Sequence, residues 1–290
     1  MLSRLDHVIV AVADLPSATD HYRALLARAP SWRGEHPGQG TANTLFRLGN
    51  GYLELLAPSG RGAHGDVLRE RLDHRGEGLF GFALACDDAA DCAATLRARG
   101  LHPTDPVEGS GRDQDTGSQR RWRNVYLPPA ETRGVRVFVI EHLSPPDALP
   151  PAAPIGEESA AAEGFDHLVV MTRDADGARA LYGDGLGIRL ALDRKFEKFD
   201  SRLLFFRVGG VSIEVAASLS GVSDPGAPDE LWGLAYRVAD VPAARTRLAA
   251  AGVEVGEVRR GRKPGTCVAT VRQPTHGVST LFIGPDSGAA

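Results

Sequence analysis

A histidine and a glutamate recur together in both halves of this 290-residue chain. His7 and Glu54 are 47 positions apart, and so are His167 and Glu214, each residue lying 160 positions after its counterpart. The neighbouring residues match too, with an Asp before each histidine and an aliphatic residue before each glutamate. A fixed offset of this size predicts one structural unit built twice, which constrains the fold more than any local motif does.

Each half divides again into two similar units. Four aspartates share one register, each between an apolar run typical of a buried strand and a segment with helical character: Asp14, Asp88, Asp174 and Asp240. Aspartate is a preferred N-cap at the start of a helix. Gly100 and Gly252 follow the second and fourth helical segments, where a left-handed residue is expected to end the helix. The units are expected at residues 4–60, 77–146, 164–218 and 229–286.

A Pro-rich segment, 144–154, separates the second unit from the third and continues into an Ala-rich stretch that ends at Glu163. Such a composition is typical of a semi-rigid linker. We therefore predict an N-terminal domain at 1–146, a linker at 147–163 and a C-terminal domain at 164–290.

Bulk properties narrow the function classes. The net charge is −4 and the pI is about 6.1, so nothing favours nucleic acid or an anionic membrane surface. No apolar run reaches the length of a membrane span. The three cysteines are scattered without CxxC spacing, as in a reducing compartment. These features predict a cytoplasmic protein that acts on a small molecule, as a monomer or a homodimer.

Four strand-helix-strand-strand-strand modules, paired into two cup-shaped mixed sheets, would make an α+β fold that resembles the vicinal oxygen chelate superfamily. Its members include glyoxalase I, type I extradiol dioxygenases, fosfomycin-resistance transferases and bleomycin-binding proteins. The resemblance covers nearly all of residues 4–285. The first half is similar to the glyoxalase-like group through residues 40–43, 52–58 and 139–142. The second half is similar to other members through 203–210 and 261–266.

The resemblance implies a divalent metal inside each cup, held by residues of the first and last strands of two modules. In the first half these positions hold His7, Glu54, Gly81 and Glu141, the last placed by a repeated Glu-x-Leu-x-Pro motif. Three ligands with open positions suit a catalytic metal. One imidazole and two carboxylates favour Mn²⁺ or Fe²⁺, with Zn²⁺ or Ni²⁺ as alternatives. Gly81 would leave room for a ligand, and Glu54 or Glu141 could act as a general base.

In the second half the same positions hold His167, Glu214, Gly233 and Phe282. Only two of these can bind metal, and Phe282 is expected to direct an apolar ring towards the site. We therefore expect a degenerate second site. A standard extradiol dioxygenase is disfavoured, because the resemblance places the iron ligands of that class in the second half.

Structural interpretations stand beside these hypotheses. A histidine in an apolar strand is commonly a hydrogen-bonded core residue. A buried glutamate needs a partner, and arginines are available at three positions: Arg121, Arg123 and Arg207.

Four basic residues are candidates for substrate binding. Arg121 and Arg123 alternate along a predicted strand, where they could line the first cup or pair on the surface. Arg262 and Lys263 precede another strand and could bind an anion at the rim of the second cup, or lie in a solvated turn.

Two classes of function follow. The first is a metal-dependent enzyme of glyoxalase type, a lyase or isomerase, acting on a small oxygen-chelating substrate in the N-terminal cup. The alternative is metal-free binding, as in resistance proteins that sequester a drug, or an atypical dioxygenase.

Overall fold

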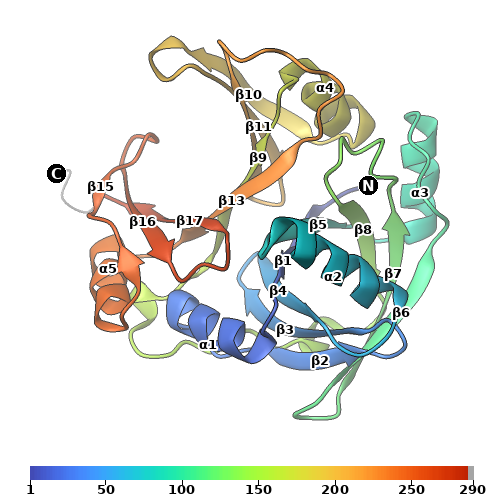
Figure 1. The fold of residues 1–290 in the computed structure, drawn as a ribbon, viewed down its shortest axis with the longest axis horizontal. Helices are drawn as coiled ribbons and strands as arrows, with labels where there is room; N and C mark the ends of the chain where they lie inside the picture. Colours follow the sequence, from blue (N-terminus) through green and yellow to red (C-terminus); the bar gives the residue numbers. More distant parts are fainter. Residues whose placement is uncertain (287–290) are drawn as a thin grey trace.

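Eight strands of the N-terminal half close into a barrel in the computed structural model, which describes residues 1–286 (Figure 1). Their order around the barrel is β1-β4-β3-β2-β6-β7-β8-β5. The strands are β1 (Arg4–Ala11), β2 (Trp32–His36), β3 (Thr41–Leu48), β4 (Gly51–Pro58), β5 (Gly78–Ala85), β6 (Val107–Asp113), β7 (Gln119–Tyr126) and β8 (Val137–His142). The helices of this half are α1 (Leu15–Leu26), α2 (Ala63–Arg75) and α3 (Ala89–Ala98).

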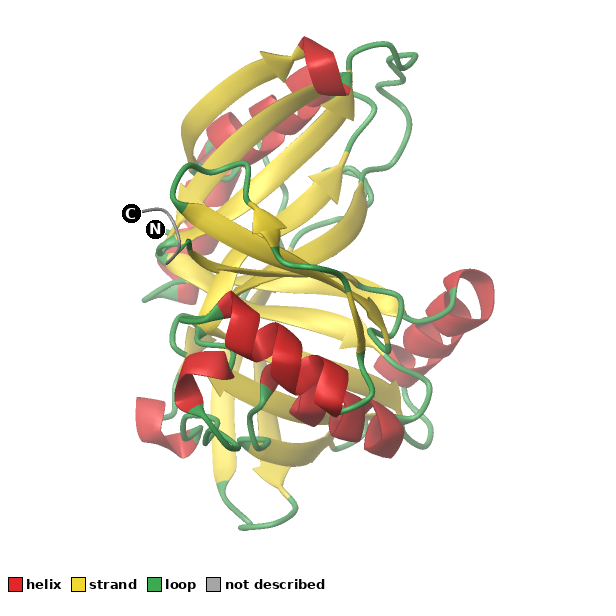
Figure 2. Ribbon diagram, turned by 90° about the vertical axis from the view of Figure 1, so that its left-hand side faces the viewer, coloured by secondary structure: helices red, strands yellow, loops and turns green. Residues whose placement is uncertain are grey.

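The C-terminal half repeats the plan as an open, nine-stranded mixed sheet with the order β10-β11-β12-β9-β13-β17-β16-β14, and with β15 paired to β16. The strands are β9 (Gly164–Met171), β10 (Arg189–Phe196), β11 (Ser201–Val208), β12 (Val211–Ser218), β13 (Glu230–Arg237), β14 (Glu254–Val255), β15 (Arg259–Arg260), β16 (Thr266–Gln273) and β17 (Ser279–Pro285). The helices are α4 (Ala175–Arg179), the π-helical η3 (Ala180–Gly185) and α5 (Val241–Ala250). Short 3-10 turns are η1 (Pro146–Ala148), η2 (Glu158–Ala160) and η4 (Glu197–Phe199). Figure 2 shows the two sheets one above the other. The predicted α+β fold with two cup-shaped sheets is confirmed.

The helix boundaries have the local cause that the sequence indicates. Each of the four aspartates accepts a hydrogen bond from the backbone N–H three residues further on, at 2.8–3.0 Å. Gly100 and Gly252, which follow α3 and α5, have φ of +86° and +77°, the left-handed conformation that ends a helix at little cost for glycine.

Strand alternation divides the N-terminal half into an inner and an outer layer. In β1, Val8 and Val10 belong to the main core, which extends across both halves. Ile9 and Ala11 face the barrel interior, where they pack with Phe138. Because side chains alternate along a strand, His7 has the interior-facing parity of Ile9.

Two segments that the module pattern leaves out pack against the barrel, one near each end. The module pattern assigns no element to residues 61–76. Helix α2 forms within this segment, and its Leu68 packs with the inner cluster. In Figure 1, α2 lies across the front of the barrel strands. At the other end, Leu149 from the Pro-rich segment packs against Trp32 and Tyr52. Among residues 1–286, no helix is long and apolar enough to span a membrane.

Candidate active site in the N-terminal barrel

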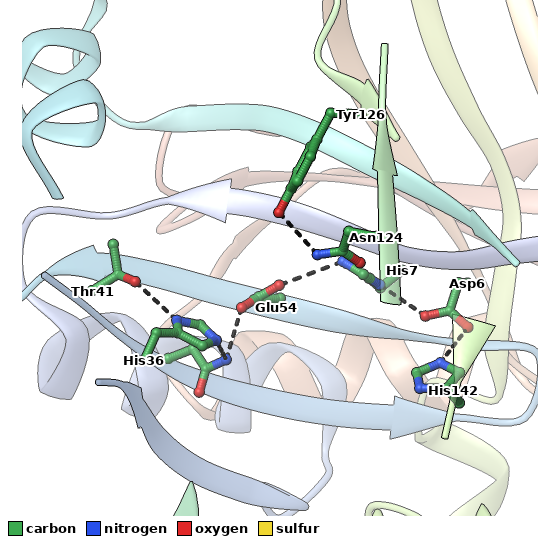
Figure 3. A network of polar contacts seen from close by, with 9 residues as sticks. Asp6, His7, His36, Thr41, Glu54, Asn124, Tyr126 and His142 are labelled. Carbon is green, nitrogen blue, oxygen red and sulfur yellow. Dashed lines mark hydrogen bonds and ion pairs between the residues drawn. The ribbon is translucent and has the colours of Figure 1, made fainter. Parts of the chain in front are cut away.

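A cavity of about 440 Å³ occupies the barrel interior. Its wall combines polar groups, namely His7, Glu54 and Asn43, with large apolar side chains such as Trp122 and Phe138. This combination of an apolar wall and a few convergent polar groups is typical of a small-molecule site. The polar groups form a connected network, drawn in Figure 3.

His7 is held from both sides. Its Nδ1 lies 2.9 Å from Oδ1 of Asp6, whose other oxygen lies 2.9 Å from Nε2 of His142. Burial alone would raise the pKa of the Asp6 carboxyl, but the hydrogen bonds from His142 and His7 outweigh it and hold that pKa well below its usual range. Since the Asp6 carboxylate can only accept, the shared proton is on Nδ1, and Nε2 of His7 faces the cavity (Figure 3).

Glu54 is the partner of that free nitrogen. Its Oε2 lies 3.6 Å from His7 Nε2, and its Oε1 accepts a hydrogen bond of 2.7 Å from the Asn43 amide. His36 lies behind Asn43, with its Nδ1 2.8 Å from the Thr41 hydroxyl. Burial lowers the pKa of the His36 imidazole, so this ring is held in the neutral form.

Aromatic rings fix the position of His7. Tyr52 stacks on the imidazole at a centroid distance of 4.5 Å, and Phe138 meets it edge-on at 5.4 Å.

Trp122 lies flat over Gly109, where an added Cβ would come 2.3 Å from the indole nitrogen. Glycine at that position is therefore required by the ring that forms the cavity wall.

The structure does not bring Glu141 to His7 and Glu54, which corrects the predicted three-ligand set. The cavity-facing residues of β8 are Phe138 and Ile140, so Glu141 points to the opposite face. There its Oε2 accepts a hydrogen bond of 3.1 Å from the backbone N–H of Ala89, in the first turn of α3, and lies 3.6 Å from Arg123. Pairing with arginine, the structural alternative for this glutamate, is what the structure shows.

The interpretation of Gly81 is also wrong. An added Cβ would lie 2.8 Å from the backbone oxygen of Arg136, in the segment leading into β8. Glycine is needed there for the close approach of two backbones, and Gly81 is not part of the cavity wall.

Of the predicted metal ligands, His7 and Glu54 are the two that lie together in the cavity. The separation between His7 Nε2 and Glu54 Oε2 allows both to contact one ion, since protein ligands lie about 2.0–2.2 Å from such metals. Among residues 1–286, however, no group of three His, Cys, Asp or Glu side chains could hold an ion. Catalytic metals usually have three protein ligands. The residues therefore do not fit a metal held by the protein alone.

Side chains alternate along the basic strand at 120–123, and those that face the cavity are not the two arginines predicted to bind substrate. Arg121 and Arg123 lie on the outer face and contact Glu108 at 3.3 and 3.7 Å. Arg120 and Trp122 line the cavity instead. The alternation was correctly predicted, but its phase could not be read from the sequence.

The second half keeps the Asp-His-Glu arrangement around His167 and Glu214. Asp166 Oδ1 lies 2.8 Å from Nδ1 of His167, whose Nε2 lies 3.8 Å from Glu214 Oε2. Burial raises the pKa of Glu214. Phe282 does not point towards this pair; it is buried in the main core, while Leu281 packs with the cup-side cluster.

Arg262 and Lys263 lie exposed in the turn before β16. The Arg262 guanidinium lies 4.8 Å from the Phe199 ring centroid. The positive charge of Lys263 contributes to the lowered pKa of Asp166, behind the larger effect of the His167 hydrogen bond. The charge of Arg262 likewise acts to lower the pKa of Glu214, against the larger effect of burial, so both residues lie near the second pair.

Three members of the site had no motif to identify them. Asn43 and His36 lie on strands whose sequence is unremarkable, and Arg120 is one of several arginines. The Asp preceding each histidine was the one available signal, since a carboxylate beside a histidine commonly orients the ring.

A barrel and an open sheet built from repeated modules, with an Asp-His-Glu group in the barrel, have the architecture of the vicinal oxygen chelate class. Residues 5–161 match the model of the glyoxalase-like domain, and residues 166–270 match that of the glyoxalase/bleomycin resistance protein/dioxygenase superfamily. The chain therefore belongs to this superfamily, and its first half is a glyoxalase-like domain.

Solved structures with the same fold include enzymes. A mutant of 4-hydroxymandelate synthase from Streptomyces coelicolor aligns with a TM-score of 0.69 and 16% identity, over 98% of this chain and 93% of that one. The Mn(II)-bound glyoxalase from Novosphingobium aromaticivorans aligns with a TM-score of 0.63 and 15% identity, over 98% and 82%. At these identities the likeness shows the fold alone.

A curated relative is similar over a short segment. The ethylmalonyl-CoA/methylmalonyl-CoA epimerase of Cereibacter sphaeroides is 36% identical over 63 residues, which is 22% of this chain. The match spans about half the length of that protein, 47%.

Proposed function

We propose that the N-terminal barrel is the active site of a glyoxalase-type isomerase or lyase that moves a proton on a small substrate with adjacent oxygen atoms. The observation that carries this proposal is the Asp6–His7–Glu54 group, placed inside a cavity that can hold such a substrate. General acid–base catalysis needs two titratable groups within reach of the reacting atoms, and Nε2 of His7 and Oε2 of Glu54 meet that need.

The two groups have complementary roles. Glu54, oriented by the Asn43 amide, accepts the proton from a carbon next to a carbonyl, and the electron pair moves onto the carbonyl oxygen. His7, oriented by Asp6 with its own proton on Nδ1, uses the free Nε2 to accept the proton of the neighbouring hydroxyl and passes it to that oxygen. Glu54 then delivers its proton to the adjacent carbon, so both groups return to their starting protonation states. The rings of Tyr52 and Phe138 hold the imidazole in place and exclude water.

A divalent ion would enter this scheme only together with the substrate, since His7 and Glu54 supply two ligands and substrate oxygens would have to supply others. Such an ion would polarise the substrate oxygens. The proton transfer assigned to Glu54 and His7 does not depend on it.

A second candidate is sequestration without chemistry. It is favoured by the absence of a third ligand among residues 1–286 and by the apolar wall that Trp122 and Phe138 form. In this case the barrel would bind a ligand and release it unchanged.

Exchange of substrate hydrogen with solvent separates the two candidates. The protein is incubated in D₂O with hydroxyacetone or pyruvate, with and without Mn²⁺, and loss of the C–H signal is followed by proton NMR. We expect catalysed exchange that falls at least about 100-fold in Glu54→Gln and in His7→Gln. Glu214→Gln, the same substitution in the second half, is the matched control and should leave the rate unchanged. Exchange that survives Glu54→Gln contradicts the proposal, whereas binding without any exchange supports sequestration.

A further inference from the structure

Arg120 is a buried cation without an anion. Its exposed fraction is 6%, although it carries a full charge and lines the cavity. Among residues 1–286, no carboxylate oxygen lies within 4.0 Å of its guanidinium, in contrast to its neighbours Arg121 and Arg123 on the same strand. A buried charge is costly unless it is paired, and the resting protein gives this charge no direct anionic partner.

Aromatic rings hold the guanidinium in place without neutralising it. It lies 5.5 Å from the ring centroids of both Trp32 and Tyr52. In contacts of this kind the face of each ring attracts the cation. They position the planar donor fork and leave several N–H donors unused, because a guanidinium has five.

The position of Arg120 fits one end of a ligand whose reactive part lies at His7. Tyr52 contacts both side chains, stacking on the His7 ring and meeting the Arg120 guanidinium. Trp32, Tyr52 and Leu149 close this end of the barrel, while the exposed His64 and Val67 mark the opposite, open end near α2. An anion at Arg120 would therefore lie at the closed end, shielded from water.

Arg136 also lines the cavity, and its guanidinium lies 4.6 Å from the Phe80 ring centroid. It is only half-buried, however, and it is close to His64 at the open end. Burial nevertheless lowers the pKa of the Arg136 guanidinium, so Arg136 is a second cation of the cavity wall, placed at the opposite end of the cavity from Arg120.

We propose that Arg120 is the anion subsite of the barrel and that the ligand is a small monocarboxylate with an apolar body. The planar fork of arginine matches a carboxylate in a bidentate manner, and the apolar body would pack against Trp122, Ile9 and Phe138. This inference rests on the proposed function for the location of the site, and it adds the chemical class of the substrate.

Binding of matched probes tests the proposal on the full chain. Benzoate, benzamide and phenyl phosphate share a ring and differ in charge and in the shape of the polar group. By calorimetry we expect benzoate to bind the wild-type protein, and benzamide to bind at least tenfold more weakly. Tighter binding of phenyl phosphate than of benzoate would overturn the carboxylate assignment in favour of a phosphate ester.

Variants locate the effect. Arg120→Met should weaken benzoate binding at least 30-fold, and Arg120→Lys, which keeps the charge but loses the fork, about tenfold. Arg121→Met is the matched control, because this neighbour points outwards with 62% of its side chain exposed; its benzoate affinity should change less than threefold. Equal affinity in wild type and Arg120→Met, or no binding of benzoate by the wild type, overturns the proposal.

Two further measurements keep the outcome unambiguous. Saturating benzoate should raise the urea midpoint of wild type and not that of Arg120→Met, which checks folding and binding in one titration. Glu54→Gln should lose hydrogen exchange while retaining Arg120-dependent benzoate binding. If the wild type shows no hydrogen exchange but binds benzoate through Arg120, the proposed enzymatic function fails and the anion subsite stands. If the wild type shows exchange but Arg120→Met binds benzoate as tightly as the wild type does, the anion subsite fails and the enzymatic function stands.

Discussion

Glu141→Ala is expected to destabilise the N-terminal half while leaving the barrel cavity intact. The Glu141 carboxylate is 14% exposed and accepts a hydrogen bond from Ala89 N–H at 3.1 Å. A hydrogen bond to a charged group contributes about 1.5–3 kcal/mol. The ion pair with Arg123, at 3.6 Å and with the arginine 42% exposed, adds at most about 1 kcal/mol. We therefore expect a loss of about 1.5–4 kcal/mol in the free energy of unfolding.

Urea unfolding followed by far-UV circular dichroism measures this loss. With a slope of about 1–3 kcal/mol per molar urea, the midpoint should fall by about 1 M. Glu141→Gln keeps a neutral acceptor at the same place, so its midpoint should lie between those of wild type and Glu141→Ala.

Ligand binding provides the decisive comparison. In Glu141→Gln, affinity for benzoate and for Mn²⁺ should equal that of wild type, because the side chain faces away from the cavity. If Glu141→Gln instead kept wild-type stability and lost binding or hydrogen exchange as Glu54→Gln does, Glu141 would act inside the cup, and the outward placement would be refuted.

Three other predictions concern the same barrel. Gly81→Ala should lower the free energy of unfolding by about 1–3 kcal/mol, because the new Cβ meets a backbone oxygen at 2.8 Å; unchanged urea unfolding would contradict the close approach. In the wild type, burial lowers the pKa of His36 below its usual 6.5. As the pH falls below 6.5, the His36 imidazole therefore takes up a proton more readily in the unfolded chain than in the folded one. The free energy of unfolding then declines by at most about 1.4 kcal/mol per pH unit because of this group. His36→Gln should remove that part of the decline between pH 7.5 and 5.5, and urea titrations with identical pH slopes would refute it. Mn²⁺ alone should bind with a Kd weaker than about 100 µM, since catalytic sites usually have three protein ligands and this cup offers two; calorimetry showing stoichiometric, micromolar binding without substrate would restore the three-ligand hypothesis.

The sequence predicted most of the fold because its signals are local or periodic. Each N-cap aspartate acts within three residues, and each αL glycine ends the helix directly before it. The His–Glu pair has the same spacing in both halves, and the structure places His7 close to Glu54 and His167 close to Glu214. An interaction repeated within a module can be inferred from a constant offset.

The tertiary structure alone decided which side chains face the cavity. The Glu-x-Leu-x-Pro motif begins on β4 and on β8, yet Glu54 faces the cavity and Glu141 does not, so a repeated motif does not transfer the facing of a side chain from one module to another. Because strand side chains alternate with a period of two, an error of one residue moves a side chain to the other face. The predicted ligand Glu141 is one residue away from Ile140, which faces the cavity. In the same way, the predicted Arg121 is one residue away from Arg120, which faces the cavity. The sequence by itself therefore determined the modules and the His–Glu pair, whereas the missing third ligand and the buried, unpaired arginine became visible only once the strands were in register.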